Sequence, residues 1–341
     1  MRALEKSRQE KGLWLIDAPV PAPAKDEVQL RITGASICGT DLHIYSWDPW
    51  AQNRIRPPLI IGHEACGEVS ALGKGVASHK VGDFVAVESH FPCRTCVQCS
   101  TGNMHLCQDM RIFGLDRNGA YADYTVVPAL CARPVGDEIK HEYASLLEPL
   151  GNAVYVTLVE PVKDKTVAVY GCGPAGLFSV AVARFCGARE IFAVEPNATR
   201  QKLAKKAGAT HVINPLKEKA SDAIRAGTKG LGADIVLEMS GNEMAINDSL
   251  ASLRRAGRYC FFGLPKGKVT LDIADGIIFR GARLYGITGR RMFETWETMA
   301  DLLRRGLDIT PLVTHSFKLE EFDKAFKVME TNDCGKVMLR V

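Results

Sequence analysis

The sequence predicts an α/β protein in which a β-rich domain is joined to a doubly wound parallel sheet. Two observations predict this fold class. From about residue 165 to 262, apolar strands alternate with helical segments, which is the order that a parallel sheet covered by helices requires. Residues 1–36 are instead rich in β signals, and residues 67–87 hold short β segments between glycine-rich turns, which is typical of a compact, barrel-like unit. At 341 residues the chain is long enough for each domain to have its own core.

The composition of the chain limits its possible binding partners and its cellular location. A net charge of +4 gives no reason to expect nucleic acid or an anionic membrane as a partner. The chain has no run of about 18 apolar residues, so we expect no membrane-spanning helix. The N-terminus lacks the apolar core of a signal peptide, so we expect a cytoplasmic protein, in which structural disulfides are rare. The eleven cysteines therefore need another explanation.

The β-rich domain shows its strands by alternation and by its turns. Residues 28–32 alternate as a half-buried strand does, residues 67–87 hold short β segments between glycine turns, and residues 121–127 return to strand character. The segment 89–118 is long, polar and rich in cysteine. A loop of that length in a compact domain needs something to hold it.

The second half of the chain alternates strands and helices. Buried strands are predicted at 166–170, 191–194, 211–213, 233–237 and 258–262. The helices between them are predicted at 177–185, 199–207 and 245–253. After residue 290 we expect helices at 295–305 and 319–330 and a last strand at 336–339.

A glycine-rich turn joins the first of these strands to its helix. Gly171, Gly173 and Gly176 fit the G-x-G-x-x-G pattern, in which the backbone can approach a pyrophosphate at a helix N-terminus. Glu195 lies nineteen residues past Gly176, where an acidic side chain holds the adenosine ribose and repels a 2′-phosphate, so NAD is favoured over NADP. We expect Arg200 to stack on adenine or to pair with phosphate.

Four cysteines crowd into the long polar segment. Their spacing, Cys93-x₂-Cys96-x₂-Cys99-x₇-Cys107, allows four thiolates to close a tetrahedron around Zn²⁺ with no open position. Free thiols and a four-cysteine iron–sulfur site are the alternatives. The spacing favours a structural zinc.

A second candidate metal site draws on residues that are far apart in the sequence. Cys38 and His63 are the natural thiolate and imidazole for a catalytic zinc, and Glu64 and Glu148 are candidate carboxylates. In the alternative, His63 is a hydrogen-bonded core histidine and Glu64 an ordinary surface charge. Next to Cys38, the hydroxyl and imidazole in Thr40-Asp41-Leu42-His43 suit proton transfer.

These motifs, in this order, resemble the zinc-dependent medium-chain dehydrogenases of the alcohol dehydrogenase superfamily, over essentially the whole chain. Within that superfamily, residues 38–48, 148–154 and 292–296 are similar to the L-threonine 3-dehydrogenases. The resemblance implies a GroES-like catalytic domain and a Rossmann domain. It also implies oxidation of L-threonine to L-2-amino-3-oxobutanoate with NAD, usually in a homotetramer that holds one catalytic and one structural zinc per subunit.

The resemblance also implies domain boundaries. The catalytic domain would span residues 1–147 and 289–341, with the structural-zinc lobe at about 89–118, and the Rossmann domain would span 148–288.

The resemblance further implies roles for individual residues. Cys38, His63 and Glu64 would be zinc ligands, Thr40 and His43 the proton relay, and Glu148 an acidic group that can enter the metal shell. The residues implied at the coenzyme, beyond the glycines, Glu195 and Arg200, are Ala175, Phe262, Gly263, Leu264, Gly286 and Ile287.

Two positions, 148 and 90, leave alternatives open, and position 175 departs from the pattern of the family. Position 148 is Asp in some such enzymes, so Glu148 can bind zinc, the substrate ammonium or a proton. Position 175 is Ala where a bulkier aliphatic often packs on the cofactor. His90 is either a residue that influences substrate choice or a plain loop histidine.

Two other functions compete with threonine oxidation. One is a polyol dehydrogenase of the sorbitol or butanediol type, with the same zinc and NAD. The other is a non-enzymatic, quinone-reductase-like binding protein that has lost the metal. The presence of Cys38, His63 and Glu64 argues against the second.

Overall fold

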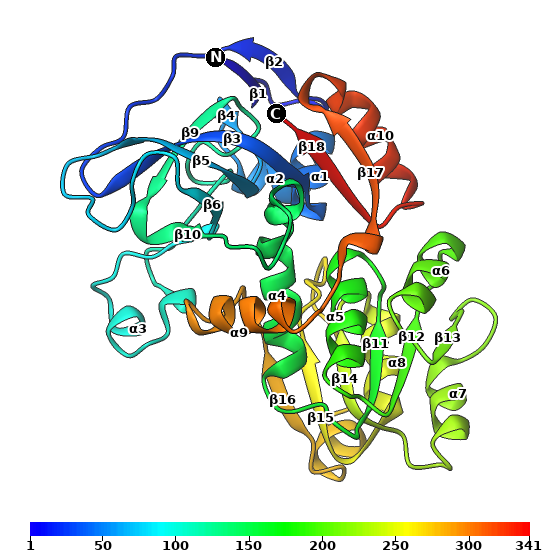
Figure 1. Ribbon diagram of the computed structural model, residues 1–341. Helices are drawn as coiled ribbons and strands as arrows, with labels where there is room; N and C mark the ends of the chain where they lie inside the picture. Colours follow the sequence, from blue (N-terminus) through cyan, green and yellow to red (C-terminus); the bar gives the residue numbers. More distant parts are fainter. The chain divides into compact units, whose positions relative to one another are not determined.

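The computed structural model describes residues 1–341, and the chain divides into two units (Figure 1). The first unit comprises Met1–Pro149 and Val313–Val341, and the second comprises Leu150–Leu312. Residues 289–312, which the resemblance assigns to the catalytic domain, group with the second unit. No helix is both long and apolar enough to cross a membrane.

The first unit is built on one long strand, β3 (Glu27–Ile37), which pairs antiparallel with three others. Its first half pairs with β9, its second half with β18, and β5 runs along nearly its whole length. The sheet order is β10-β6-β5-β3-β18-β17, with β9 on β3. The other strands of this sheet are β5 (Glu64–Leu72), β6 (Phe84–Val87), β9 (Tyr124–Pro128), β10 (Ala132–Pro134), β17 (Val313–Lys318) and β18 (Lys336–Arg340).

Alternation along β3 explains its place in the core. Val28, Leu30 and Ile32 are buried and point to one side, as the period of two predicts. They pack in an apolar cluster with residues of β6 and β9. A second cluster joins the end of β3 to helices α1 (Gly39–Ser46) and α10 (Phe322–Thr331).

Smaller elements complete the first unit. Two small sheets are formed by β1 (Arg2–Lys6), β2 (Trp14–Asp17) and β4 (Leu59–Ile60), and by β7 (His90–Phe91) with β8 (Arg111–Ile112). The α-helices are α1 (Gly39–Ser46), α2 (Pro49–Arg54), α3 (Val97–Ser100) and α10 (Phe322–Thr331). Short 3₁₀ turns are η1 (Met104–Leu106), η2 (Ala129–Cys131), η3 (His141–Leu146) and η6 (Leu319–Glu321). Helix α4 (Leu147–Leu158) carries the chain into the second unit.

The second unit is a six-stranded parallel sheet with order β13-β12-β11-β14-β15-β16. In chain order this is 3-2-1-4-5-6, the doubly wound Rossmann order. The strands are β11 (Thr166–Tyr170), β12 (Glu190–Val194), β13 (His211–Ile213), β14 (Ala233–Glu238), β15 (Leu253–Phe261) and β16 (Arg283–Gly286). The predicted fold class, a Rossmann sheet with a β-rich domain, is confirmed.

Helices flank this sheet (Figure 1). Helix α5 (Pro174–Phe185) packs against β11 and β12, and α8 (Glu243–Ser252) packs against β11, β14 and β15. The remaining helical segments are α6 (Ala198–Lys206), α7 (Ala220–Gly227), η4 (Ala274–Ile278), α9 (Glu294–Arg304) and η5 (Thr310–Leu312).

Sequence patterns missed two strands that lie at sheet edges, β16 and β17, although they predicted the edge strand β13. Strand β11 is buried along its whole length and was predicted from its apolar run. Strand β16 is largely exposed and begins with Arg283, and β17 alternates between half-buried and exposed residues. An edge strand buries little apolar surface, so its sequence carries little apolar signal.

Candidate active site

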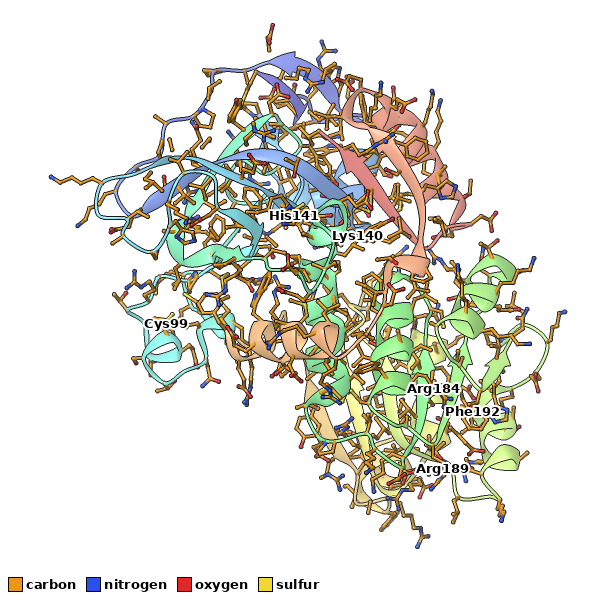
Figure 2. The ribbon with its side chains drawn as sticks, in the orientation of Figure 1. Cys99, Lys140, His141, Arg184, Arg189 and Phe192 are labelled. Carbon is orange, nitrogen blue, oxygen red and sulfur yellow. The ribbon has the colours of Figure 1, made fainter.

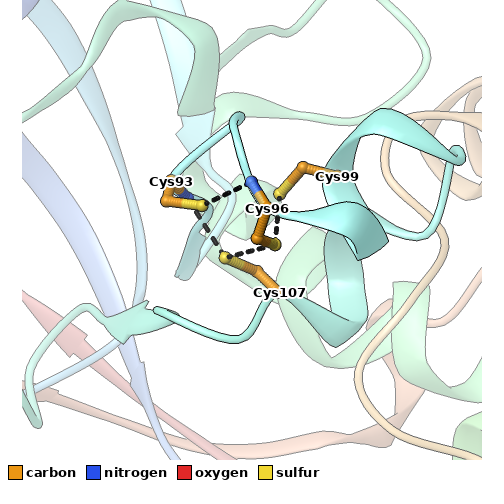
Figure 3. A group of neighbouring side chains, drawn as sticks. All are labelled: Cys93, Cys96, Cys99 and Cys107. Atoms are coloured by element: carbon orange, nitrogen blue, oxygen red, sulfur yellow. Dashed lines mark hydrogen bonds between the residues drawn. The ribbon is translucent and has the colours of Figure 1, made fainter.

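The four cysteines of the polar segment meet at one point (Figure 3). The sulfur of Cys96 lies 3.6 Å from that of Cys99 and 3.9 Å from that of Cys107, and all four sulfurs lie within 4.8 Å of one another. All are free thiols, as these separations require. A zinc–sulfur bond of about 2.3 Å places the corners of a tetrahedron about 3.8 Å apart. The four sulfurs therefore fit one closed zinc site.

Backbone amides of the same segment point at these sulfurs. The amides of Cys96 and Thr95 donate to the sulfur of Cys93 at 3.3 and 3.5 Å, and the amide of Cys93 donates to Cys107 at 3.2 Å. The hydrogen bonds from Thr95, followed by that from Cys96, lower the pKa of Cys93 to about 6. The Cys93 thiolate is therefore favoured near neutral pH, whereas burial raises the pKa of Cys99 to about 12. Figure 2 labels Cys99, the member of the group carried by α3.

A second group of possible ligands lies at the end of β3. Cys38 directly follows this strand as the N-cap of α1, and Glu64 begins β5. The antiparallel register sets Ser36 opposite Glu64, so the end of β3 lies beside the start of β5. One ligand atom each of Cys38, His63 and Glu64 lies within 4.8 Å of the others. Glu148 is not a member of this group.

Gly62 fixes the approach of the chain to His63. Its φ is +94°, and a Cβ added there would lie 2.3 Å from the ring of Tyr121. Both the backbone angle and the close contact therefore require glycine. The buried Tyr121 hydroxyl donates to Asp41 Oδ2 at 2.9 Å. Burial, and then the Asp41 and Glu64 carboxylates, raise the pKa of Tyr121 well above its usual value, so it stays a donor.

Asp41 stands behind both Cys38 and His63. Its Oδ2 also accepts the amide of Cys38 at 2.9 Å, and its Oδ1 lies 3.5 Å from Nδ1 of His63. Both of these facing atoms are buried without a hydrogen-bond partner. Burial lowers the pKa of His63. Asp41 and Cys38 together raise this pKa by a larger amount, so the net shift is well upward. A carboxylate behind an imidazole is the usual support of a metal-binding histidine, so the donor set fits zinc.

A buried lysine faces Glu64. The Lys336 ammonium lies 2.6 Å from Glu64 Oε1 and donates to the carbonyl of Ile37 at 3.0 Å. Both side chains are only 1% exposed, and the Ser36 hydroxyl donates to the other carboxylate oxygen of Glu64. Burial lowers the pKa of Lys336, but the charges of Glu64 and Cys38 and the hydrogen bond to Glu64 together raise it by more, so the net shift is upward. The charge of Glu64 is therefore matched by a cation of the chain itself.

Thr40 and His43 lie on α1, beside the Cys38 end of the group. The Thr40 hydroxyl oxygen is 3.8 Å from the sulfur of Cys38. His43 follows three residues later, on the same face of the helix. Its Nδ1 lies 2.5 Å from Oδ2 of Asp48. Sequence patterns predicted the hydroxyl and the imidazole but not the carboxylate.

Glu148 lies in the first turn of α4 and is 4% exposed. Its Oε1 accepts a hydrogen bond from the Ser89 hydroxyl at 2.6 Å. Next to Ser89, His90 places its Nδ1 3.2 Å from the buried carboxylate of Glu88. Sequence analysis missed Glu88 and Ser89. The signal that could have found them is two polar residues directly after the buried strand β6.

The predicted coenzyme residues gather at one edge of the parallel sheet. Gly171, Gly173, Ala175 and Gly176 follow β11, Glu195 follows β12, Phe262, Gly263 and Leu264 follow β15, and Gly286 and Ile287 end or follow β16. In doubly wound sheets, ligands bind at the carboxyl ends of the strands, where the strand order reverses. Here that point lies between β11 and β14.

The glycine-rich turn and Glu195 are joined directly. Oε2 of Glu195 accepts the amide of Cys172 at 2.7 Å, and its Oε1 accepts that of Asn197 at 3.0 Å. A Cβ on Gly176 would lie 2.0 Å from the carbonyl oxygen of Gly171, so α5 approaches the turn too closely for any other residue. Arg200 lies on α6, and its amide is bonded to the N-cap Asn197.

Sequence analysis missed one buried acid at this edge. Glu238 ends β14, and its carboxylate accepts the amides of Ser240 and Gly241 at 2.9 and 3.1 Å. Its backbone carbonyl accepts the amide of Phe262 at 3.0 Å. Burial raises the pKa of Glu238. The residue braces the loop after β14, next to the glycine-rich turn.

Comparison with known proteins shows the family to which this chain belongs. Residues 24–137 match the alcohol dehydrogenase GroES-like domain, and residues 174–305 match the zinc-binding dehydrogenase domain. L-threonine 3-dehydrogenases of Caldanaerobacter subterraneus subsp. tengcongensis and Pyrococcus furiosus are 44% and 45% identical to this chain, over 99% of it and 98% of each relative. The chain belongs to the zinc-binding dehydrogenase family. Both clusters of possible zinc ligands agree with that membership.

Solved zinc-binding and alcohol dehydrogenases share the whole fold. An alcohol dehydrogenase of Escherichia coli solved with NADH is 27% identical, with a TM-score of 0.91 over 100% of this chain and 99% of that one. The 2R,3R-butanediol dehydrogenase of Bacillus subtilis is 26% identical, with a TM-score of 0.89 over 100% of this chain and 99% of that one.

Proposed function

We propose that this zinc-binding dehydrogenase oxidises the C3 hydroxyl of L-threonine to give L-2-amino-3-oxobutanoate, with NAD as hydride acceptor. The observation that carries the proposal is the near-full-length identity of 43–45% to L-threonine 3-dehydrogenases. The group formed by Cys38, His63 and Glu64, with Thr40 and His43 beside it, supplies the chemistry that such a reaction needs.

The cofactors supply the electronic part of the reaction. A bound zinc lowers the pKa of an alcohol, and NAD accepts the hydride from C3. Cys38, His63 and Glu64 would hold the zinc, and Asp41 and Lys336 keep the imidazole and the carboxylate oriented. The turn from Gly171 to Gly176 and the acid at Glu195 would hold the NAD.

The chain itself has to move one proton. The substrate loses its hydroxyl proton and a hydride, so one proton leaves the site for each NADH formed. We propose that the Thr40 hydroxyl passes this proton to the imidazole of His43, whose side chain is 48% exposed and can release it to water. Proton transfer of this kind contributes about 10²-fold or more to a rate.

We propose that Glu148 serves the substrate ammonium or a proton, as an acid close to the metal group. The carboxylate is buried and accepts a hydrogen bond from the Ser89 hydroxyl, which holds it in place. Its position outside the group of Cys38, His63 and Glu64 supports this role over that of a permanent metal ligand. We further propose that His90, held by Glu88, influences substrate choice.

The test is an assay of NADH formation by purified, zinc-loaded protein with L-threonine, sorbitol and 2,3-butanediol, each with and without a chelator. We expect L-threonine to be oxidised fastest, and the chelator to abolish the signal. Oxidation of a polyol but not of L-threonine would favour the butanediol-type enzyme that the solved structure from Bacillus subtilis represents. Absence of any signal would favour the binding protein.

We also propose a homotetramer, and the second unit supports an interface between copies. Strand β16 is the outermost strand of its sheet, with one edge open to a further strand (Figure 1). Near it, Ile278, Phe279 and Leu284 are exposed by 65%, 70% and 41%. Open edges and apolar patches of this kind mark interaction surfaces. Light scattering should give about four times the chain mass of 37.2 kDa, and Phe279→Glu should reduce it. A monomeric mass contradicts the proposal.

We propose the cytoplasm as the location. All eleven cysteines are free thiols, and cytoplasmic proteins keep their thiols reduced. A cysteine cluster that binds zinc depends on the same condition, because oxidation would remove the thiolates.

A further inference from the structure

His43 and Asp48 form a pair that the sequence motifs did not single out. Helix α1 ends at Trp47, which adopts the left-handed conformation with φ of 55°, and the chain turns back so that Asp48 becomes the N-cap of α2. One carboxylate oxygen of Asp48 accepts the amide of Ala51 at 3.0 Å. The other lies 2.5 Å from Nδ1 of His43. The tilted ring of Trp50, 5.8 Å away, packs beside the imidazole.

The carboxylate of Asp48 decides which nitrogen of His43 is free. Burial raises the pKa of Asp48, but the Ala51 amide and His43 lower it more, so the side chain is ionised at neutral pH. An ionised carboxylate can only accept, and the proton of the neutral imidazole therefore resides on Nδ1. Nε2 then keeps its lone pair and is the atom that can take up a proton. The same contact fixes the plane of the ring.

We propose that Asp48 is the positioning residue of the proton relay, because it holds His43 in the tautomer whose Nε2 accepts the proton from Thr40. This inference rests on the proposed function, which supplies the proton. Nε2 receives the proton that leaves the Thr40 hydroxyl as Thr40 takes up that of the substrate. The carboxylate balances the charge of the imidazolium, which then returns its proton to water. No bond between heavy atoms forms or breaks.

The competing explanation is that Asp48 only caps α2. Two substitutions separate the roles, because Asn and Ser both cap helices well. In Asp48→Asn the amide oxygen caps Ala51, and the amide N–H group then faces Nδ1 of His43. That donor selects the opposite tautomer, with the proton on Nε2. In Asp48→Ser the hydroxyl caps the helix and is too short to reach the ring, so His43 can adopt either tautomer.

The experiment measures kcat and KM for the alcohol substrate in wild type, Asp48→Ser and Asp48→Asn, together with zinc content, NADH binding and melting temperature. We expect kcat to fall in that order, by about 10²-fold in Asp48→Asn, the low end of a general acid–base contribution. KM, zinc content, NADH affinity and melting temperature should stay close to wild type. A lower kcat in Asp48→Asn than in Asp48→Ser is the result that a capping role alone would not produce.

A double-mutant cycle with His43→Ala completes the test. If Asp48 acts through His43, Asp48→Asn should cost no further activity once the imidazole is gone. Equal kcat in Asp48→Asn and Asp48→Ser, or full additivity with His43→Ala, would overturn the inference and leave the proposed function intact. If the wild-type protein oxidises a polyol instead of L-threonine, only the proposed substrate is wrong. The kcat values of wild type, Asp48→Ser and Asp48→Asn are then compared with that polyol as substrate. Wild type that oxidises no alcohol overturns both.

Discussion

The two groups of possible zinc ligands in the first unit are built in opposite ways. The cysteine group draws all its ligands from residues 93–107, and backbone amides of the same segment donate to its sulfurs. Cys93 and Cys96 are partly exposed, and Cys107 is buried. The Cys38 group draws its ligands from two strand ends that pair across the sheet, and it is largely buried. Charged side chains from distant parts of the chain surround it.

The difference explains what each group can do. Four thiolates from one short segment leave a metal no open position, so the cysteine group can only hold the fold of its own lobe. Three ligands of mixed type can leave a position for a substrate oxygen. Asp41 and Lys336 then provide the orientation and the compensating charge that a buried, open site needs.

Replacing Cys38 should separate the two groups most sharply. We expect Cys38→Ala to lower turnover by at least about 10³-fold, about 4 kcal/mol of barrier, because the polarisation of the alcohol is lost. Zinc content should fall from two ions to one per chain, with the cysteine lobe still loaded. NADH formation and elemental analysis measure both. Cys186→Ala, at a cysteine outside both groups, is the matched control. Two bound ions in Cys38→Ala would contradict the assignment of this group.

Removing the buried cation beside the Cys38 group should destabilise the fold. We expect Lys336→Met to lower the free energy of unfolding by about 3–5 kcal/mol, because it leaves the Glu64 carboxylate buried without its partner. Denaturant unfolding of metal-free protein measures this, and adding Glu64→Gln should restore much of the loss. Lys324→Met breaks an exposed ion pair with Glu321 and should change stability little. Equal losses in both lysine variants would show that the buried pair has no special role.

The contrast between the groups also explains what could be predicted from the sequence. The cysteine group was predicted from spacing, because all its contacts are local. The glycine-rich turn with Glu195 was likewise placed by a fixed distance along the chain, and the structure joins them by the hydrogen bond from Cys172. The first site lies within one loop, and the second lies within one strand–helix–strand unit.

The partners of the buried group could not be predicted in this way. Lys336 is 272 residues from Glu64, and Tyr121 is 80 residues from Asp41. Nothing in the local pattern around Lys336 distinguishes a fully buried lysine from a surface one. Asp48 was overlooked for another reason: its contact with His43 depends on the left-handed turn at Trp47, which propensity does not indicate.

Disrupting the cysteine lobe should have the smallest effect on turnover. We expect Cys96→Ala to lose the zinc of the lobe. Residues 93–107 should then become accessible to proteolysis, because the remaining sulfurs and the amides that donate to them are no longer held together by a metal. Turnover should fall by less than about tenfold, about 1.4 kcal/mol, since the Cys38 group shares no ligand with the lobe. Ser100→Ala, in the same lobe, should leave zinc and protection intact. A loss of turnover as large as that of Cys38→Ala would show that the lobe's order reaches the buried group, through the adjacent strand β7.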